Sequence, residues 1–187
     1  MAFPIIILPV AAAGYLWWKT SKRPANSLEE SLPESEFGAG VAPECLELVE
    51  SALGWPYYYG RGSPSTPWTD GRLGVDCSGL VQMCLVKFGL LSSKSVDRGA
   101  TDLANVADPV AVGDQKPGDF AVYPGHVAFV VGYPDPAQNY HSPVLSASGG
   151  TSTTKGNDPN ARVKLWDTAD YRATSAFITY ARIRPGV

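Results

Sequence analysis

The sequence has few residues of the kinds that hold metal ions or build disulfide frameworks. It contains two histidines and three cysteines among 187 residues. The three cysteines, scattered at positions 45, 77 and 84, do not make a disulfide framework, and with two histidines they form no cluster of metal ligands. The net charge is −3 and no basic stripe is present, which argues against a nucleic-acid partner. The sequence therefore predicts a protein that needs neither a metal nor a cofactor.

A helix is predicted around Cys77. Apolar residues at the spacing of one buried helix face follow it, at Leu80, Val81, Cys84, Leu85 and Phe88. Asp76 is a good N-cap type, and Gly89 stands where a C-cap glycine belongs. A cysteine in the first turn lies near unpaired backbone N–H groups and the positive end of the helix dipole, and both favour the nucleophilic thiolate. The alternative is a small buried core residue, which is how we interpret Cys45 and Cys84.

Several sequence blocks resemble the NlpC/P60 family of cysteine peptidases. Residues 76–81 have the sequence Asp-Cys-Ser-Gly-Leu-Val, residues 116–120 Lys-Pro-Gly-Asp-Phe, and residues 125–132 Gly-His-Val-Ala-Phe-Val-Val-Gly. Upstream, residues 53–60 (Leu-Gly-Trp-Pro-Tyr-Tyr-Tyr-Gly) are similar to the family's G-x-P-Y-x-W-G segment, with Tyr59 in the tryptophan's place. The blocks follow the family's order and cover roughly residues 44 to 183.

The resemblance assigns the chemistry to three residues. Cys77 matches the family's nucleophile, and His126 matches its histidine, which serves as the base that a thiol nucleophile needs within hydrogen-bond reach. Tyr57 matches the tyrosine whose hydroxyl lies over the cysteine and helps bind the developing oxyanion. For Tyr57 the alternative is an ordinary place in the aromatic core.

The third catalytic position departs from the family pattern. The family has a polar residue there, commonly His and sometimes Asn or Gln, whereas Ser146 falls at this position here. A serine hydroxyl accepts a hydrogen bond from an imidazole N–H, but it is neutral and short and holds the tautomer less firmly. Ser148 or a displaced His141 are alternatives for this role. Candidates for substrate binding, close to the cysteine in sequence, are Trp68, Arg72 and Ser78.

The order of predicted elements indicates an α+β fold. A helix is expected from Pro43 to Leu53 and a short one around residues 101–106, within an otherwise irregular stretch from 90 to 117. The last third has β-rich runs between turn residues, at 120–123, 126–133, 144–148, 162–166 and 177–183. The second run is apolar on both faces, which is typical of a central strand. The resemblance implies a papain-like core in which helices pack on an antiparallel sheet.

The N-terminal region differs in character from the rest of the chain. Residues 3–18 are apolar without interruption and are followed by Lys19, Lys22 and Arg23. Because a basic segment before the apolar run and a clean cleavage site are missing, we favour a membrane anchor over residues 1–23 rather than a cleaved signal peptide. A flexible acidic linker over 24–42 and a peptidase domain over 43–187 complete the predicted organisation.

The resemblance implies a thiol protease that degrades the bacterial cell wall. Its substrate would be the peptidoglycan stem peptide, cut at the amide next to a γ-D-glutamyl residue. The expected location is the cell envelope, but the positive charges after the anchor favour a cytoplasmic domain, and the membrane of a phage virion is a setting that avoids this conflict. Two alternatives remain: an amidase or acyltransferase on the same scaffold, and an inactive wall-binding or structural membrane protein.

Overall fold

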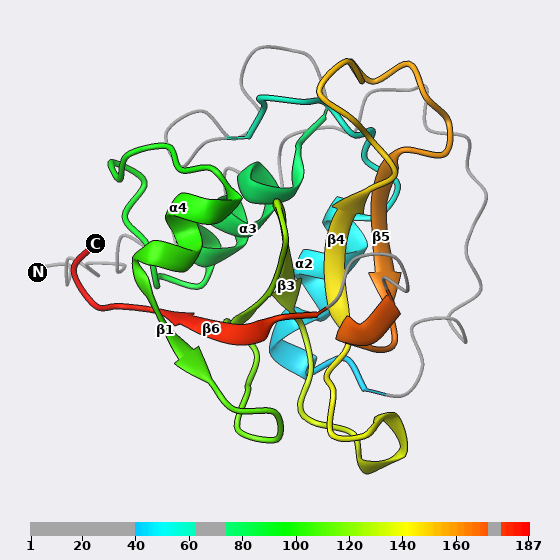
Figure 1. Cartoon of the computed structure of the whole chain (residues 1–187). Helices are drawn as coiled ribbons and strands as arrows, with labels where there is room; N and C mark the ends of the chain where they lie inside the picture. The colour runs from blue at the N-terminus through cyan, green and yellow to red at the C-terminus, as the bar shows by residue number, and fades with distance from the viewer. Residues whose placement is uncertain (1–39, 63–73, 172–176) are drawn as a thin grey trace, which may run out of the picture. The chain divides into compact units, whose positions relative to one another are not determined.

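Short β-rich runs assemble into one six-stranded antiparallel sheet in the computed structural model (Figure 1). The structure describes residues 40–62, 74–171 and 177–187, which lie in one unit spanning Phe37–Val187. With helices packed on this sheet, the predicted α+β class is confirmed. The predicted anchor over residues 1–23 and most of the linker lie outside the described residues, and no helix in the described part of the chain is long and apolar enough to cross a membrane.

The strands run in the order β1-β6-β2-β3-β4-β5 across the sheet. Their bounds are Ala107–Val110 (β1), Phe120–Tyr123 (β2), His126–Val130 (β3), Val144–Ser148 (β4), Arg162–Trp166 (β5) and Thr179–Ile183 (β6). All five predicted runs form strands, although β3 ends three residues early and β6 begins two residues late. All five residues of β3 are buried, as expected for a strand with apolar residues on both faces.

Strand β1 was not predicted, because Asp108 and Pro109 are poor strand formers. The structure places β1 at one edge of the sheet, where Pro109 pairs with Ala181 of β6. A proline lacks the backbone N–H that a second neighbouring strand would need, so it is tolerated at an edge. The position of a strand within a sheet is a tertiary property, and the local sequence did not reveal it.

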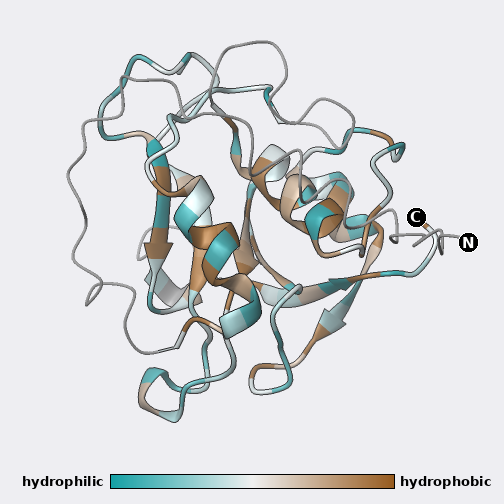
Figure 2. Cartoon of the chain, turned by 180° about the vertical axis from the view of Figure 1, so that it is seen from behind, coloured by the Kyte–Doolittle hydropathy of each residue, from teal (hydrophilic) through white to brown (hydrophobic). Residues whose placement is uncertain are grey.

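The main helices lie on one face of the sheet. They are α2 (Leu46–Ala52), which follows the 3₁₀ turn η2 (Pro43–Cys45), α3 (Cys77–Lys87) and α4 (Ala100–Asn105). Helix α3 packs on β3 and β4, and its apolar residues share a core with Val127 and Phe129. Figure 2 shows brown apolar residues beside teal polar ones on α2, which agrees with the burial of Leu48 and Val49 and the exposure of Glu50.

The folded part begins before the predicted boundary at Pro43. The backbone N–H of Ala42 donates to the carbonyl oxygen of Val131 at 2.9 Å, and Val41 forms a β-bridge with Gly132. The last residues of the predicted linker are therefore tied to the end of the central strand.

Candidate active site

Cys77 is the first residue of α3, and Asp76 caps this helix. One carboxylate oxygen of Asp76 accepts from the Gly79 N–H at 2.8 Å and from the Ser78 hydroxyl at 3.0 Å; the other accepts from the Gly60 N–H at 2.8 Å. The predicted N-cap is thus confirmed. The same side chain also ties the loop at residue 60 to the start of the helix, which fixes the backbone around Cys77.

The Cys77 thiol is surrounded by backbone donors. The N–H groups of Val127, Ser78 and Cys77 itself are directed at the sulfur and lower the pKa of the thiol. The side chain is only 8% exposed, and this burial raises the pKa more strongly than those groups lower it, with a smaller contribution from the Asp76 carboxylate. The net pKa is raised, because desolvation of the buried thiol penalises the charged form more than the nearby backbone groups favour it.

His126 begins β3 and is buried, with 6% of its surface exposed. Its Nε2 atom lies 2.9 Å from Oγ of Ser146 on β4 and 3.0 Å from the hydroxyl of Tyr171, and that hydroxyl donates to Ser146 Oγ at 2.8 Å. The side chain at the predicted third position therefore lies beside the histidine. His141, one of the alternatives, instead places its Nδ1 atom 3.1 Å from the Tyr180 hydroxyl.

Tyr171 is the residue of this cluster that the sequence did not suggest. It lies in the 3₁₀ turn η4 (Ala169–Tyr171), 45 residues after His126 along the chain. Its ring stacks on Trp166 of β5, with centroids 4.5 Å apart and planes 12° apart, and meets Tyr123 edge-on at 5.8 Å. No sequence motif surrounds Tyr171; the packing of η4 against the core cluster that contains Tyr123 and Val144 brings its hydroxyl to the histidine.

The strand that carries the histidine also touches the cysteine. Val127, the residue after His126, directs its backbone N–H at the Cys77 sulfur. The packing of α3 on β3 thus brings the candidate nucleophile to the start of the strand that the candidate base begins.

Of the other predicted site residues, Tyr57 and Ser78 lie in the described part of the chain. Tyr57 is 7% exposed, pairs with Val75 in a β-bridge and packs its ring so closely on Gly150 that a Cβ there would overlap it. The Ser78 hydroxyl donates its hydrogen to the Asp76 carboxylate, so this hydrogen is already used in a hydrogen bond within the protein. Trp68 and Arg72 lie outside the described residues.

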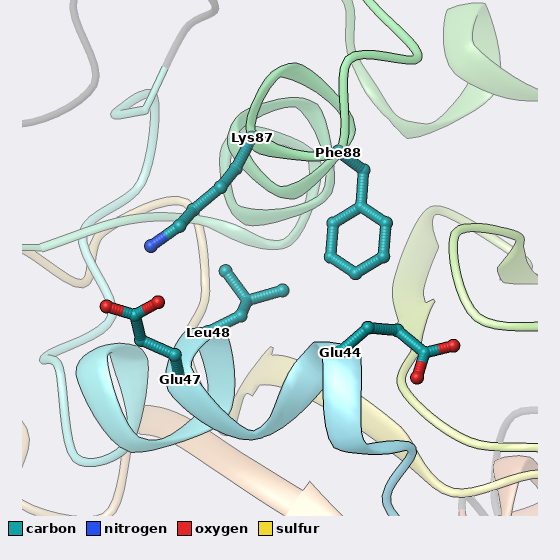
Figure 3. A pocket seen from close by; sticks show the side chains of 5 residues that line it. All are labelled: Glu44, Glu47, Leu48, Lys87 and Phe88. Atoms are coloured by element: carbon teal, nitrogen blue, oxygen red, sulfur yellow. The ribbon is translucent and has the colours of Figure 1, made fainter. Parts of the chain in front are cut away.

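A shallow pocket of about 180 Å³ lies at the opposite end of α3 from Cys77 (Figure 3). It is lined by Glu44, Glu47, Leu48, Lys87 and Phe88. Cys77 and Lys87 are ten residues apart along the helix, or roughly 15 Å, so this pocket is separate from the thiol. Within the described ranges, no group of three or more His, Cys, Asp or Glu side chains is arranged to hold a metal ion.

Several solved structures are similar to the chain, among them the following three. The peptidoglycan hydrolase RipB of Mycobacterium tuberculosis shares 27% identity over 73% of this chain and 61% of its own, with a TM-score of 0.48. The P60 domain of an antigen of M. avium subspecies paratuberculosis shares 22% identity over 73% of this chain and 89% of its own, with a TM-score of 0.46. A lipoprotein-like protein of the NLP/P60 family from Staphylococcus aureus shares 19% identity over 78% of this chain and 43% of its own, with a TM-score of 0.49.

Two of these structures, the P60 domain and the S. aureus protein, carry the name of the family that the sequence blocks resemble. No family model matches the chain, and no curated protein matches it. The chain spans 61% of RipB and 43% of the S. aureus protein, and the TM-scores of these three structures are below 0.5. The case for a particular activity therefore rests on the sequence blocks and on the geometry around Cys77 and His126.

Proposed function

We propose that this domain is a cysteine peptidase of the NlpC/P60 type, with a papain-like core, that hydrolyses an amide bond of the peptidoglycan stem peptide. One observation carries the proposal: Cys77 opens a capped helix that packs on β3, the strand that His126 begins. The family's sequence blocks supply these two residues in the right order. The hydroxyls beside His126 supply the orienting contact that a catalytic base requires.

In the proposed reaction the buried Cys77 starts as a neutral thiol. As the sulfur attacks the amide carbonyl carbon, His126 takes the thiol proton, and the carbonyl oxygen becomes an oxyanion. Collapse of this intermediate breaks the C–N bond, and the imidazolium gives its proton to the leaving amine. The product of this step is a thioester on Cys77. Water, deprotonated by the same imidazole, attacks the thioester, the C–S bond breaks to release the acid, and the imidazolium returns its proton to the sulfur. Proton transfer with the thiol falls to Nδ1, since Nε2 bonds the hydroxyls.

The resemblance supplies the finer features of the proposal. They are the cut next to a γ-D-glutamyl residue, the oxyanion contact from the Tyr57 hydroxyl, and substrate contacts from Trp68, Arg72 and Ser78. The peptidoglycan hydrolase activity of RipB is consistent with this substrate class.

We further propose that residues 1–23 anchor the enzyme in the cell envelope or in a phage virion membrane. Retention of the full chain in a carbonate-washed membrane pellet would support the anchor, whereas release into the supernatant would contradict it.

The activity is tested by incubating the full chain with muropeptides and identifying the products by mass spectrometry. We expect matched amine and acid fragments from the wild type and a loss of about a thousandfold or more in the Cys77→Ala variant, because the nucleophile is removed. Cys84→Ala is the matched control: Cys84 is buried in the same helix but lies two turns from its start. Circular dichroism verifies the fold of each variant.

The alternatives predict other outcomes. Turnover of lipid or small-molecule amides without cleavage of muropeptides would identify an amidase or acyltransferase. A chain that binds muropeptides and cleaves none of these substrates would be a wall-binding module, and the peptidase proposal would be abandoned.

A further inference from the structure

We infer that Tyr171 is a positioning residue for the catalytic base, and that its oxygen, rather than that of Ser146, is the principal acceptor for the His126 Nε2–H. The inference rests on the proposed function and deepens it. A pair of hydroxyls would then replace the single orienting residue that the sequence led us to expect at position 146.

The three polar atoms form a closed triangle. Nε2 of His126 lies 2.9 Å from Ser146 Oγ and 3.0 Å from the Tyr171 oxygen, and the two oxygens are 2.8 Å apart. Nε2 carries one hydrogen at most, so the two oxygens compete for it. The direction of the third hydrogen bond decides between them.

In that third bond the Tyr171 hydroxyl donates to Ser146 Oγ. A hydroxyl that donates its hydrogen becomes a better acceptor, because hydrogen bonds in a chain polarise one another. The Ser146 oxygen already accepts from Tyr171, and it is therefore a weaker second acceptor. Ser146 thus engages the tyrosine hydrogen and turns the tyrosine lone pairs toward His126.

This arrangement fixes the tautomer of the imidazole. When Nε2 donates to Tyr171, Nδ1 carries the lone pair that takes the thiol proton, as the proposed reaction requires. The imidazolium formed during attack keeps the same Nε2–H bond, so the tyrosine oxygen also stabilises the charged form. Neither hydroxyl carries a formal charge, and both therefore act by orientation more than by electrostatic attraction.

The Tyr171 ring is held independently of its hydroxyl. It stacks on Trp166 at 4.5 Å and packs edge-on against Tyr123 at 5.8 Å. The Tyr123 hydroxyl also donates to the carbonyl oxygen of Ala169, and this hydrogen bond holds the backbone of η4 in place. Because these contacts involve the ring and the backbone, Tyr171→Phe removes the hydroxyl while leaving the packing intact.

The test compares the pH dependence of kcat/KM of the full chain in three variants. For Tyr171→Phe we expect kcat to fall about ten- to a hundredfold, as for a misplaced catalytic group, with KM unchanged. The acid limb of the profile should move to lower pH, because the imidazolium loses an acceptor. Ser146→Ala should have the smaller effect, since the tyrosine oxygen stays. Tyr133→Phe, which removes a surface hydroxyl bonded to Glu44, is the matched control.

Two results would overturn the inference. A Tyr171→Phe profile that coincides with that of Tyr133→Phe would show that the hydroxyl has no part in catalysis. A larger loss in Ser146→Ala than in Tyr171→Phe would assign the orienting role to Ser146 alone.

A measurement that needs no turnover separates this inference from the proposed function. The ¹⁵N NMR shifts of the imidazole report its tautomer directly, and a His141→Gln background leaves His126 as the only histidine. We expect the Nε2–H tautomer in the wild type and a mixture in Tyr171→Phe. If muropeptides are not cleaved but this change occurs, the peptidase proposal fails and the role of Tyr171 in orienting His126 stands. If the wild type and Tyr171→Phe show the same tautomer, the positioning role is wrong.

Discussion

The two halves of the candidate site are built in different ways. Around Cys77 the donors are backbone N–H groups, and the Asp76 carboxylate ties the start of the helix to the preceding loop through the N–H groups of Gly79 and Gly60. Around His126 the partners are side-chain hydroxyls from β4 and η4. Backbone donors persist through most substitutions, whereas a hydroxyl is lost by a single one. The nucleophile should therefore be sensitive to changes in backbone geometry, and the base to changes in side-chain identity.

The largest effect on the cysteine half should come from Gly79→Ala. A Cβ at this position would overlap the carbonyl oxygens of Arg61 and Gly62, and backbone atoms have no other rotamer to adopt. We expect a loss of about 3 kcal/mol in the free energy of unfolding, measured by urea denaturation. At Gly99 the nearest heavy atom to an added Cβ is 3.7 Å away, so Gly99→Ala is the control and should lose less than about 1 kcal/mol. Equal losses in both variants would contradict the close approach of α3 to the 61–62 loop.

A second change, Asp76→Ala, removes only the side-chain carboxylate. It leaves the N–H groups of Gly79 and Gly60 without their acceptor, and we expect a loss of about 2 kcal/mol in the free energy of unfolding. Asp135→Ala is the comparison, because Asp135 caps the exposed turn η3 (Pro136–Gln138) by accepting from the Ala137 N–H. Its loss should be about 0.5 kcal/mol. If both variants lost the same amount, Asp76 would be an ordinary cap and not the organiser of the loop.

Alkaline pH tests the burial of the cysteines. Burial raises the pKa of Cys45 to about 12 and also raises the pKa values of Cys77 and Cys84. Above the ordinary thiol value of 9.0, cysteines ionise in the unfolded chain but stay protonated in the fold, so stability falls as pH rises. Each buried thiol should contribute a slope of up to about 1.4 kcal/mol per pH unit. Urea denaturation at several pH values should give a shallower slope for Cys84→Ala; an unchanged slope would contradict the raised pKa of Cys84.

The smallest expected effect is on the reactivity of Cys77. Asn caps helices as well as Asp does, so Asp76→Asn keeps the cap and removes the charge that raises the pKa of Cys77. Alkylation of Cys77 at pH 8, followed by mass spectrometry, should become about two- to fivefold faster. Glu44→Gln is the control, because Glu44 raises the pKa of Cys45 and is not among the groups that shift Cys77. A slower reaction in Asp76→Asn would mean that the carboxylate favours the thiolate.

The sequence by itself determined the elements that depend on local chemistry. Asp76 and Gly89 delimit α3, as their cap-forming properties predicted. The β-rich runs between turn residues located five of the six strands in the described part of the chain. Sequence blocks also singled out Cys77 and His126 and pointed to Ser146, because these positions stand at fixed offsets within short motifs.

The tertiary structure decided what depends on neighbours that are distant along the chain. It placed Tyr171 beside His126, put Pro109 at a sheet edge, and buried Cys77 so that its pKa rises. Desolvation and contacts between separate strands and turns arise only when the chain packs, and the residues around each position carry no local signal of them.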